Sequence, residues 1–177
     1  MIHFGQLALD GSPRIAVPFR DGNDPASIAR ALELGMDIAE LRIDQFANRN
    51  TAHVLRKIEK FQGVPILATV RSATEGGAWP DSDTARLELY RAILPQVDAV
   101  DVEWSSSSIA THVVSAARAL AKPVVLSFHD FTSTPGLKTL NLMAPLAREA
   151  GADIVKIAAM CNSQDDVRTL THFTLDH

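Results

Sequence analysis

Short apolar segments alternate with longer amphipathic segments along most of the chain. A short apolar run bounded by turn residues is typical of a buried strand, whereas apolar positions recurring every three or four residues are typical of a helix. The predicted strands are residues 2–8, 14–19, 37–44, 65–71, 98–104, 123–129 and 154–158. The predicted helices are residues 26–34, 50–61, 83–94, 108–120, 137–150 and 163–175. A strand-then-helix unit therefore recurs about six times.

Local signals support several of these boundaries. Asp24 followed by Pro25 is typical of a helix N-cap with proline at the first helical position. Gly35 and Gly151 follow predicted helices, where glycine commonly ends them. Ser163 and Asp166 have the spacing of a capping box at the start of the last helix.

Strands that alternate with helices predict a parallel sheet with right-handed crossovers. Two α/β architectures fit, namely an open doubly wound sheet and a TIM-type (β/α)8 barrel. The first strand-to-helix turn, residues 21–25, lacks a Gly-x-Gly-x-x-Gly pattern, so dinucleotide binding has no support. No linker or low-complexity segment divides the sequence, which predicts one domain over residues 1–177.

Several predicted strands are polar on one face, although strands of a doubly covered sheet should be apolar almost throughout. Alternation places on one face Glu40, Arg42 and Asp44; Thr69 and Arg71; Asp101 and Glu103; Ser127 and His129; and Lys156. In a closed barrel these side chains would converge near the carboxyl ends of the strands, where barrel enzymes hold their active sites. The pattern favours the barrel, although the same acidic and basic groups could also form a structural ion-pair network.

Composition narrows the classes of partner. The chain has 177 residues, 46% of them hydrophobic, and a formal net charge of −4, which gives no electrostatic reason to expect nucleic acid. Cys161 is the single cysteine, so an internal disulfide is excluded. No apolar run approaches the roughly 20 residues of a membrane span, and the N-terminus lacks signal-peptide features. We therefore expect a cytoplasmic protein that binds neither nucleic acid nor membrane.

Lys156 interrupts the apolar strand at residues 154–158. Burial disfavours the ammonium form of a lysine, and a neutral amine is the nucleophile that forms a Schiff base with a carbonyl compound. The alternative is a lysine whose stem packs while its charged head reaches water.

His129 lies on the preceding predicted strand, and a histidine is a natural general base at neutral pH. An iminium formed at Lys156 would make the neighbouring carbon acidic, and His129 could remove that proton. The pair therefore predicts elimination, or carbon–carbon bond cleavage or formation, next to a carbonyl. The alternative for His129 is a hydrogen-bonded core histidine.

Four segments carry a family resemblance. They are Glu-Leu-Arg-Ile-Asp at residues 40–44, Thr-Val-Arg-Ser-Ala-Thr-Glu-Gly-Gly at 69–77, Ser-Phe-His-Asp-Phe at 127–131 with Thr-Pro at 134–135, and Asp-Ile-Val-Lys-Ile-Ala at 153–158. In these segments the chain resembles the type I 3-dehydroquinate dehydratases of the shikimate pathway, over essentially its whole length.

The resemblance implies a (β/α)8 barrel that needs neither metal nor organic cofactor. It implies that Lys156 forms an imine with the ketone of 3-dehydroquinate, and that His129 removes the C2 proton and helps the C1 hydroxyl leave as water. Glu75 would orient the histidine, whereas Glu40, Arg42 and Arg71 would bind the substrate hydroxyls. Glu40 with Arg42 could instead be a structural pair, and Glu75 could belong to a simple loop turn.

The resemblance also implies two further strand–helix units that this sequence does not contain. In the family those units carry an arginine, a serine and a glutamine that hold the substrate carboxylate. We expect an incomplete barrel with two open edges, and either a fragment of a longer enzyme or a short form with weak activity. A homodimer is expected, since a second chain could cover an open edge. The alternative functions are a class I Schiff-base aldolase and a non-catalytic remnant that binds a ligand or partner.

Overall fold

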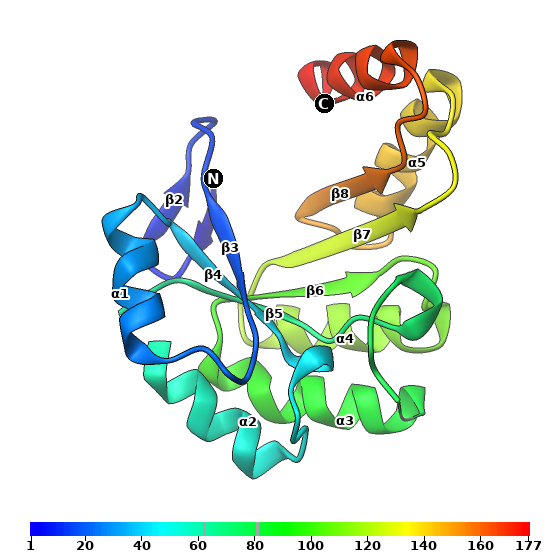
Figure 1. The fold of residues 1–177 in the computed structure, drawn as a ribbon. Coiled ribbons are helices and arrows are strands. Elements are labelled where there is room, and N and C mark those ends of the chain that lie inside the picture. Colours follow the sequence, from blue (N-terminus) through cyan, green and yellow to red (C-terminus); the bar gives the residue numbers. More distant parts are fainter. Residues whose placement is uncertain (62, 81) are drawn as a thin grey trace.

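A computed structural model describes residues 1–61, 63–80 and 82–177. Within these residues, six parallel strands form a curled sheet in the order β3-β4-β5-β6-β7-β8, with helices on its convex side (Figure 1). The strands are β3 (Ala16–Phe19), β4 (Ile38–Arg42), β5 (Ile66–Thr69), β6 (Ala99–Glu103), β7 (Val124–Asp130) and β8 (Ile154–Ala159). The helices are α1 (Pro25–Glu33), α2 (Thr51–Ile58), α3 (Asp83–Ile93), α4 (Ser107–Ala119), α5 (Leu137–Glu149) and α6 (Gln164–Asp176). The predicted TIM-type fold, incomplete with about six units, is confirmed.

The prediction of one continuous strand at residues 2–8 is wrong. The segment is an antiparallel hairpin of β1 (Ile2–Phe4) and β2 (Leu7–Leu9) that lies outside the parallel sheet. Gly5 makes the turn with φ of +57°, and a Cβ atom there would lie 2.8 Å from Asp98 Oδ1. Glycine is therefore required both by the backbone conformation and by the close approach.

Side-chain caps fix the helix starts near the predicted positions. Asp24 accepts a hydrogen bond from Ser27 N at 2.8 Å, and Pro25 occupies the first turn of α1. The capping box predicted for Ser163 and Asp166 is present at α6. Each cap satisfies backbone N–H groups that the helix itself cannot pair.

An aspartate repeatedly joins two neighbouring strands at their amino ends. Asp37, Asp98 and Asp153 come directly before β4, β6 and β8. Their Oδ2 atoms accept hydrogen bonds from the backbone N–H groups of Ile15, Ile66 and Val124, at 2.7, 2.9 and 2.8 Å. Each carboxylate thereby fixes the register of one strand pair: β3 with β4, β5 with β6, and β7 with β8.

The convex face of the sheet is apolar and packs against the helices. Leu41, Ala68, Val102 and Leu126 point to this side and belong to the main hydrophobic core. These residues alternate with the polar positions identified in the sequence, because successive side chains of a strand point to opposite faces.

The concave face has an apolar floor at the amino ends of the strands. Phe4 of the hairpin, 2% exposed, packs there in a separate cluster. The residues that it joins come from the starts of four strands: Ile38, Leu67, Ala99 and Val125. The hairpin thus covers the amino end of the curled sheet, and the polar side chains lie further along each strand.

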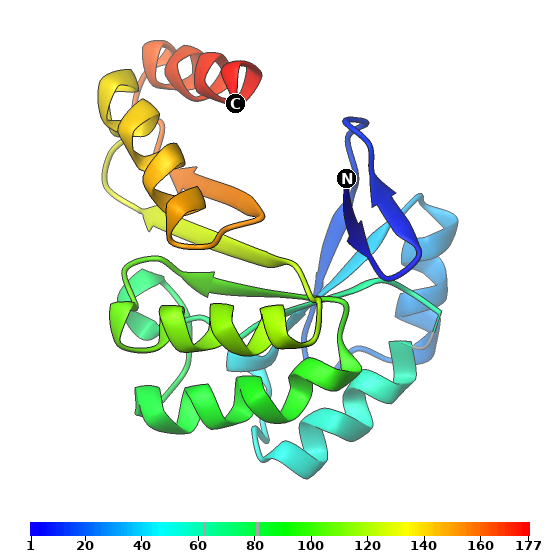
Figure 2. The ribbon, with the colours of Figure 1, turned by 180° about the vertical axis from the view of Figure 1, so that it is seen from behind.

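The last two strands and helices form an arm that is less deeply packed. All six residues of β8 are half-buried, and Ile157 contacts a small cluster of Leu140, Ala144 and Phe173 from α5 and α6. Figure 2 shows this arm from behind, with α5 covering β7 and β8. Across the described residues, no helix has the length and apolar character needed to cross a membrane.

Candidate active site

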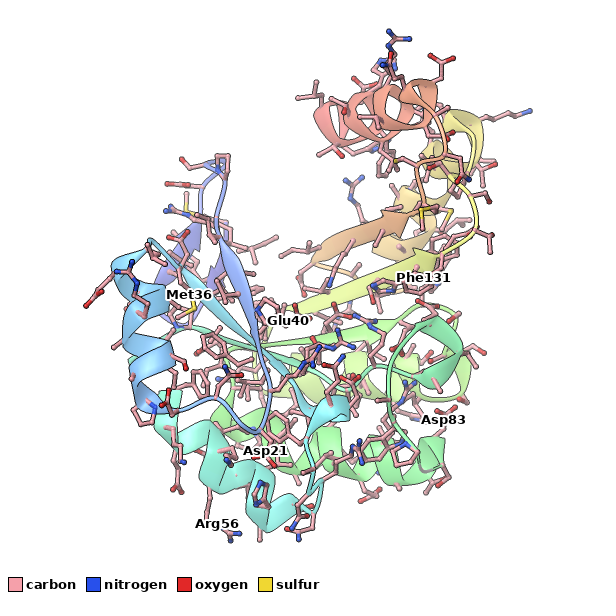
Figure 3. The ribbon with its side chains drawn as sticks, viewed as in Figure 1. Asp21, Met36, Glu40, Arg56, Asp83 and Phe131 are labelled. Carbon is pink, nitrogen blue, oxygen red and sulfur yellow. The ribbon has the colours of Figure 1, made fainter. Side chains whose placement is uncertain are left out.

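The polar side chains of five neighbouring strands share the concave face. In the parallel register Ser127 lies beside Lys156, Glu103 beside Ser127, and Thr69 beside Asp101. Neighbouring residues in register point to the same side of a sheet. The convergence predicted from alternation is therefore present, and Figure 3 shows Glu40 at the middle of this face.

Asp101 is the fully buried centre of the group. Its carboxylate accepts hydrogen bonds from Arg71 Nη2 at 2.8 Å, Ser127 Oγ at 2.6 Å and Lys156 Nζ at 3.0 Å. Burial would by itself raise the pKa of Asp101, but Arg71, Lys156 and Ser127 together hold that pKa below its ordinary value. Asp101 is therefore a charged anchor and a poor proton acceptor.

Lys156 lies between two carboxylates. Besides its contact with Asp101, Nζ is 3.8 Å from Glu40 Oε1. Glu40 in turn accepts a hydrogen bond from Thr69 Oγ1 at 2.8 Å. The side chain of Lys156 is 36% exposed, so the burial expected for it is only partial. The amine is thus both anchored and reachable from the concave side.

The two arginines predicted for the site lie in ion pairs. Arg71, 3% exposed, contacts both Asp101 and Glu103, the latter at 3.1 Å. Burial alone would lower the pKa of Arg71, but these two carboxylates raise it. Arg42 makes a two-pronged contact with Asp44, at 3.0 and 2.9 Å. The expected network of paired charges is confirmed, and the partner of Arg42 within it is Asp44.

Glu75 and His129 are brought together from distant parts of the sequence. Glu75 ends the 3-10 turn η3 (Ala73–Glu75) and is 6% exposed. Its Oε2 lies 2.8 Å from His129 Nδ1 and 3.1 Å from the His129 backbone N–H that donates to it. Ser105 Oγ donates to the other carboxylate oxygen. A carboxylate in this position fixes the orientation and tautomer of the imidazole.

The following two glycines hold the turn against its surroundings. Gly76 has φ of +73°, and a Cβ atom there would lie 2.5 Å from the ring of Phe131, labelled in Figure 3 at the end of β7. A Cβ atom on Gly77 would lie 2.1 Å from the carbonyl oxygen of Arg71. Glycine at both positions lets the turn approach β5 and β7 closely enough to place Glu75.

His129 and Lys156 project from the same face of the sheet. Lys156 is in register with Ser127, and His129 lies two residues beyond Ser127 on β7. The structure therefore offers an amine and a carboxylate-oriented imidazole on one concave surface. Such a pair can form an imine and then move a proton next to it. Among the described residues, no group of three or more His, Cys, Asp or Glu side chains is arranged to hold a metal ion.

Arg86 and Ser105 reach this network but were missed in the sequence. Arg86 lies on α3, is fully buried and pairs with Glu103. A signal was available, since Arg86, Tyr90 and Ile93 have helical spacing on an otherwise apolar stripe. Ser105 sits in a run of serines, and nothing in the sequence distinguishes it from its neighbours.

Comparison with known proteins groups the chain with one enzyme family. The model of the family described as type I 3-dehydroquinase matches residues 15–177. The curated 3-dehydroquinate dehydratase of Methanosarcina barkeri is 36% identical, over 99% of this chain and 75% of the relative. That of Methanosarcina acetivorans is 40% identical, over 83% of this chain and 64% of the relative. The chain thus spans about three quarters of the length of the first relative.

Solved structures give the same grouping. The crystal structure of the 3-dehydroquinate dehydratase from Aquifex aeolicus has a TM-score of 0.83 and 32% identity, covering 93% of this chain and 75% of that chain. A type I enzyme from Clostridium difficile, solved with covalently modified comenic acid, gives 0.83 and 32%, covering 93% and 69%. A Schiff-base-forming fructose-1,6-bisphosphate aldolase has a TM-score of 0.52 at 15% identity, which is a likeness of fold alone.

Proposed function

The chain belongs to the type I 3-dehydroquinase family, and from this premise we propose that it is a hydro-lyase that dehydrates 3-dehydroquinate to 3-dehydroshikimate. One observation carries the proposal. The amine of Lys156 and the Glu75–His129 pair lie on the same concave face, within a network of paired charges.

Lys156 is the proposed nucleophile. Its amine attacks the substrate ketone, and loss of water gives an iminium, a Schiff base that withdraws electrons from the adjacent carbon. The amine must first lose a proton. Asp101 is a poor acceptor because Arg71 lowers its pKa, so we assign this proton to Glu40, whose Oε1 lies 3.8 Å away.

His129 is the proposed base. It removes the C2 proton, and the electron pair moves into the iminium to give an enamine. The imidazolium then returns the proton to the C1 hydroxyl, which leaves as water in a syn elimination. Hydrolysis of the imine frees the product and Lys156. Glu75 stabilises the imidazolium and keeps the second ring nitrogen directed at the substrate.

Glu40 and Arg42 are the proposed substrate-binding residues that a ligand can reach directly, with side chains 15% and 22% exposed. Arg71 is 3% exposed and its Nη atoms already contact Asp101, Glu103 and Ser127. We therefore assign Arg71 to the buried charge network beneath the site, where its charge balances Asp101 and Glu103.

Borohydride trapping tests the proposal. Incubation with 3-dehydroquinate and borohydride should add the mass of the reduced ligand to Lys156, read by peptide mass spectrometry. Without borohydride, absorbance of the conjugated enone should appear. Lys156→Met should lose both signals, whereas Lys138→Met, which changes an exposed lysine on α5, should keep them. An unmodified Lys156 at saturating substrate would contradict the proposal.

An aldolase reaction is not favoured. The curated relatives from Methanosarcina barkeri and Methanosarcina acetivorans, at 36% and 40% identity, are dehydratases, whereas the aldolase shares its fold alone. Aldolase activity would give a smaller carbonyl fragment in place of the enone.

Three further expectations from the sequence belong to the proposal. Residues 1–177 form one domain, the enzyme works in the cytoplasm, and it forms a homodimer. The single exposed cysteine fits a reducing compartment, and β3 and β8 are the two edges of the sheet. Light scattering coupled to size exclusion should give twice the chain mass of 19.2 kDa.

A further inference from the structure

Arg86 is a buried charge for which the proposed reaction has no use. Its side chain is fully buried on α3, the helix behind β5 and β6 on the convex side of the sheet. Burying a guanidinium is strongly unfavourable unless its partners are well placed. What Arg86 contacts is therefore informative.

The contacts of Arg86 centre on Glu103. Nη1 donates to Glu103 Oε2 at 2.8 Å and to the Val70 carbonyl at 3.3 Å. Nη2 donates to Ser106 Oγ at 2.6 Å and lies 3.4 Å from Asp83 Oδ1, at the start of α3 (Figure 3). Among the described residues, Arg86 Nε has no hydrogen-bond partner. One face of Glu103 is thus fixed from behind the sheet.

The other face of Glu103 is turned to the active-site side. Oε1 accepts hydrogen bonds from Arg71 Nη1 at 3.1 Å and from the backbone N–H of Ser72 at 2.8 Å. Oε2 also accepts from Ser106 Oγ at 3.0 Å. Glu103 is fully buried and joins two guanidinium groups, one on each side of the sheet.

Ser72 connects this carboxylate to the proposed base. The Ser72 carbonyl accepts hydrogen bonds from the backbone N–H groups of Glu75 at 3.1 Å and Gly77 at 2.9 Å. Those bonds shape the turn that presents Glu75 to His129. A continuous series of contacts therefore runs from Arg86 through Glu103 and Ser72 to Glu75 and His129.

We propose that Arg86 is a positioning residue that acts through Glu103 to hold the Glu75–His129 pair in place. This inference rests on the proposed function for its catalytic meaning. With Arg86 removed, the buried Glu103 loses one of its two cations and turns toward Arg71, which releases Ser72 and loosens the turn. The effect falls on the proton transfer by His129 and leaves imine formation at Lys156 intact.

Hydrogen exchange in the absence of ligand tests the structural half. The His129 amide donates to Glu75, and the Val100 amide donates to the Pro123 carbonyl in the middle of the sheet. In Arg86→Met, exchange at His129 should accelerate about tenfold relative to Val100. Tyr90→Phe is the matched control, because it removes a buried hydroxyl from the same helix without touching Glu103, and should leave that ratio unchanged.

A double-mutant cycle tests whether the effect passes through Glu103. In a Glu103→Gln background, Arg86→Met should change the His129 ratio by less than about twofold, since coupled residues are not additive. If Arg86→Met does not fold, Ser106→Ala removes a partner of the same carboxylate oxygen and should raise the ratio about threefold. An unchanged ratio in the folded variants, or full additivity, would overturn the inference.

Kinetics test the catalytic half. Arg86→Met should lower kcat about tenfold, whereas the yield of borohydride-trapped adduct at Lys156 stays equal to that of the wild type. Arg86→Lys, which keeps the charge beside Glu103, should recover most of kcat. A loss of trapping equal to the loss of kcat would assign Arg86 a general structural role. Absence of enone from the wild type itself would refute the proposed function, and the exchange ratio would still decide the positioning.

Discussion

The strands in the middle of the sheet differ from the arm that follows them in how deeply they are packed. Every residue of β5 and β6 is buried, whereas every residue of β8 is only half-buried. The middle strands pack against α3 and α4 in the main core, and β8 packs against the small cluster of α5 and α6. The same alternation of polar and apolar residues thus lies in two different environments.

The difference separates fixed charges from the reactive group. Asp101 and Glu103, with no exposure, are held in the tightly packed part, while Lys156 lies in the arm with 36% of its side chain exposed. A carboxylate that only anchors benefits from rigid surroundings. An amine that must lose a proton and form a covalent bond needs access to ligand and water.

The largest expected effect comes from removing the reactive group. Lys156→Met should lower turnover of 3-dehydroquinate at least about a thousandfold, because the covalent route is lost. Continuous absorbance of the enone measures the loss. Turnover within tenfold of the wild type would mean that the half-buried arm does not carry the nucleophile.

Folding stability should show the opposite order from turnover, with a larger loss from the middle strands than from the arm. Arg71→Met should lower the free energy of unfolding by about 3–5 kcal/mol, because it leaves two buried carboxylates without a shared cation. Lys156→Met should cost at most about 1 kcal/mol, because its charge is partly solvated. Urea unfolding of both variants measures these free energies. Equal losses would contradict the difference between the tightly packed middle strands and the arm.

Apolar truncations compare the two regions without altering charge. Ile93→Ala, at a fully buried position of the main core, should lower the free energy of unfolding by about 2–5 kcal/mol. Ile157→Ala, at a half-buried position of β8, should cost roughly half as much, because truncation there removes less buried apolar surface. Chemical denaturation followed by circular dichroism gives both values.

Gly77→Ala tests how tightly the turn with Glu75 is held against the packed strands. The new methyl group would meet the Arg71 carbonyl and push the turn away, at a cost of about 1–3 kcal/mol. Turnover of 3-dehydroquinate should fall by more than the loss of folding stability explains, because Glu75 moves with the turn. Gly22→Ala, with open space around it, serves as the control in thermal unfolding and in the enone assay.

The smallest effect concerns Asp21, which ties the β3–α1 loop to α2 through Lys57 and His53. Burial acts to raise the pKa of Asp21, but hydrogen bonds from Lys57 and His53 lower it to about 2. The stabilisation is therefore fully present above the unfolded pKa of about 3.9 and is lost as the pH falls through about 2. Asp21→Asn should cost about 1 kcal/mol at pH 7, and the difference in urea unfolding should narrow between pH 5 and pH 2.5.

The element order and the shared polar face could be predicted because both depend on neighbouring residues. Asp24 and Ser163 cap helices through bonds that span three residues, and alternation alone places Asp101 and Lys156 on one face. The hairpin turn at Gly5 depends instead on Asp98, which is distant in sequence. The 36% exposure of Lys156 depends on the position of β8 at the edge of the sheet, which alternation along the strand does not show. Arg86 could not be assigned to the network from sequence, because its pairing with Glu103 depends on how α3 packs against β6.

The aspartates before β4, β6 and β8 have one more consequence. They group the six strands into three neighbouring pairs, β3–β4, β5–β6 and β7–β8, and a carboxylate–amide hydrogen bond joins each pair at its amino end. The β7–β8 pair contains both His129 and Lys156, and its hydrogen bond runs from Val124 N–H to Asp153. If β7 and β8 move relative to the rest of the sheet, we therefore expect His129 and Lys156 to move together, with little change in the distance between them.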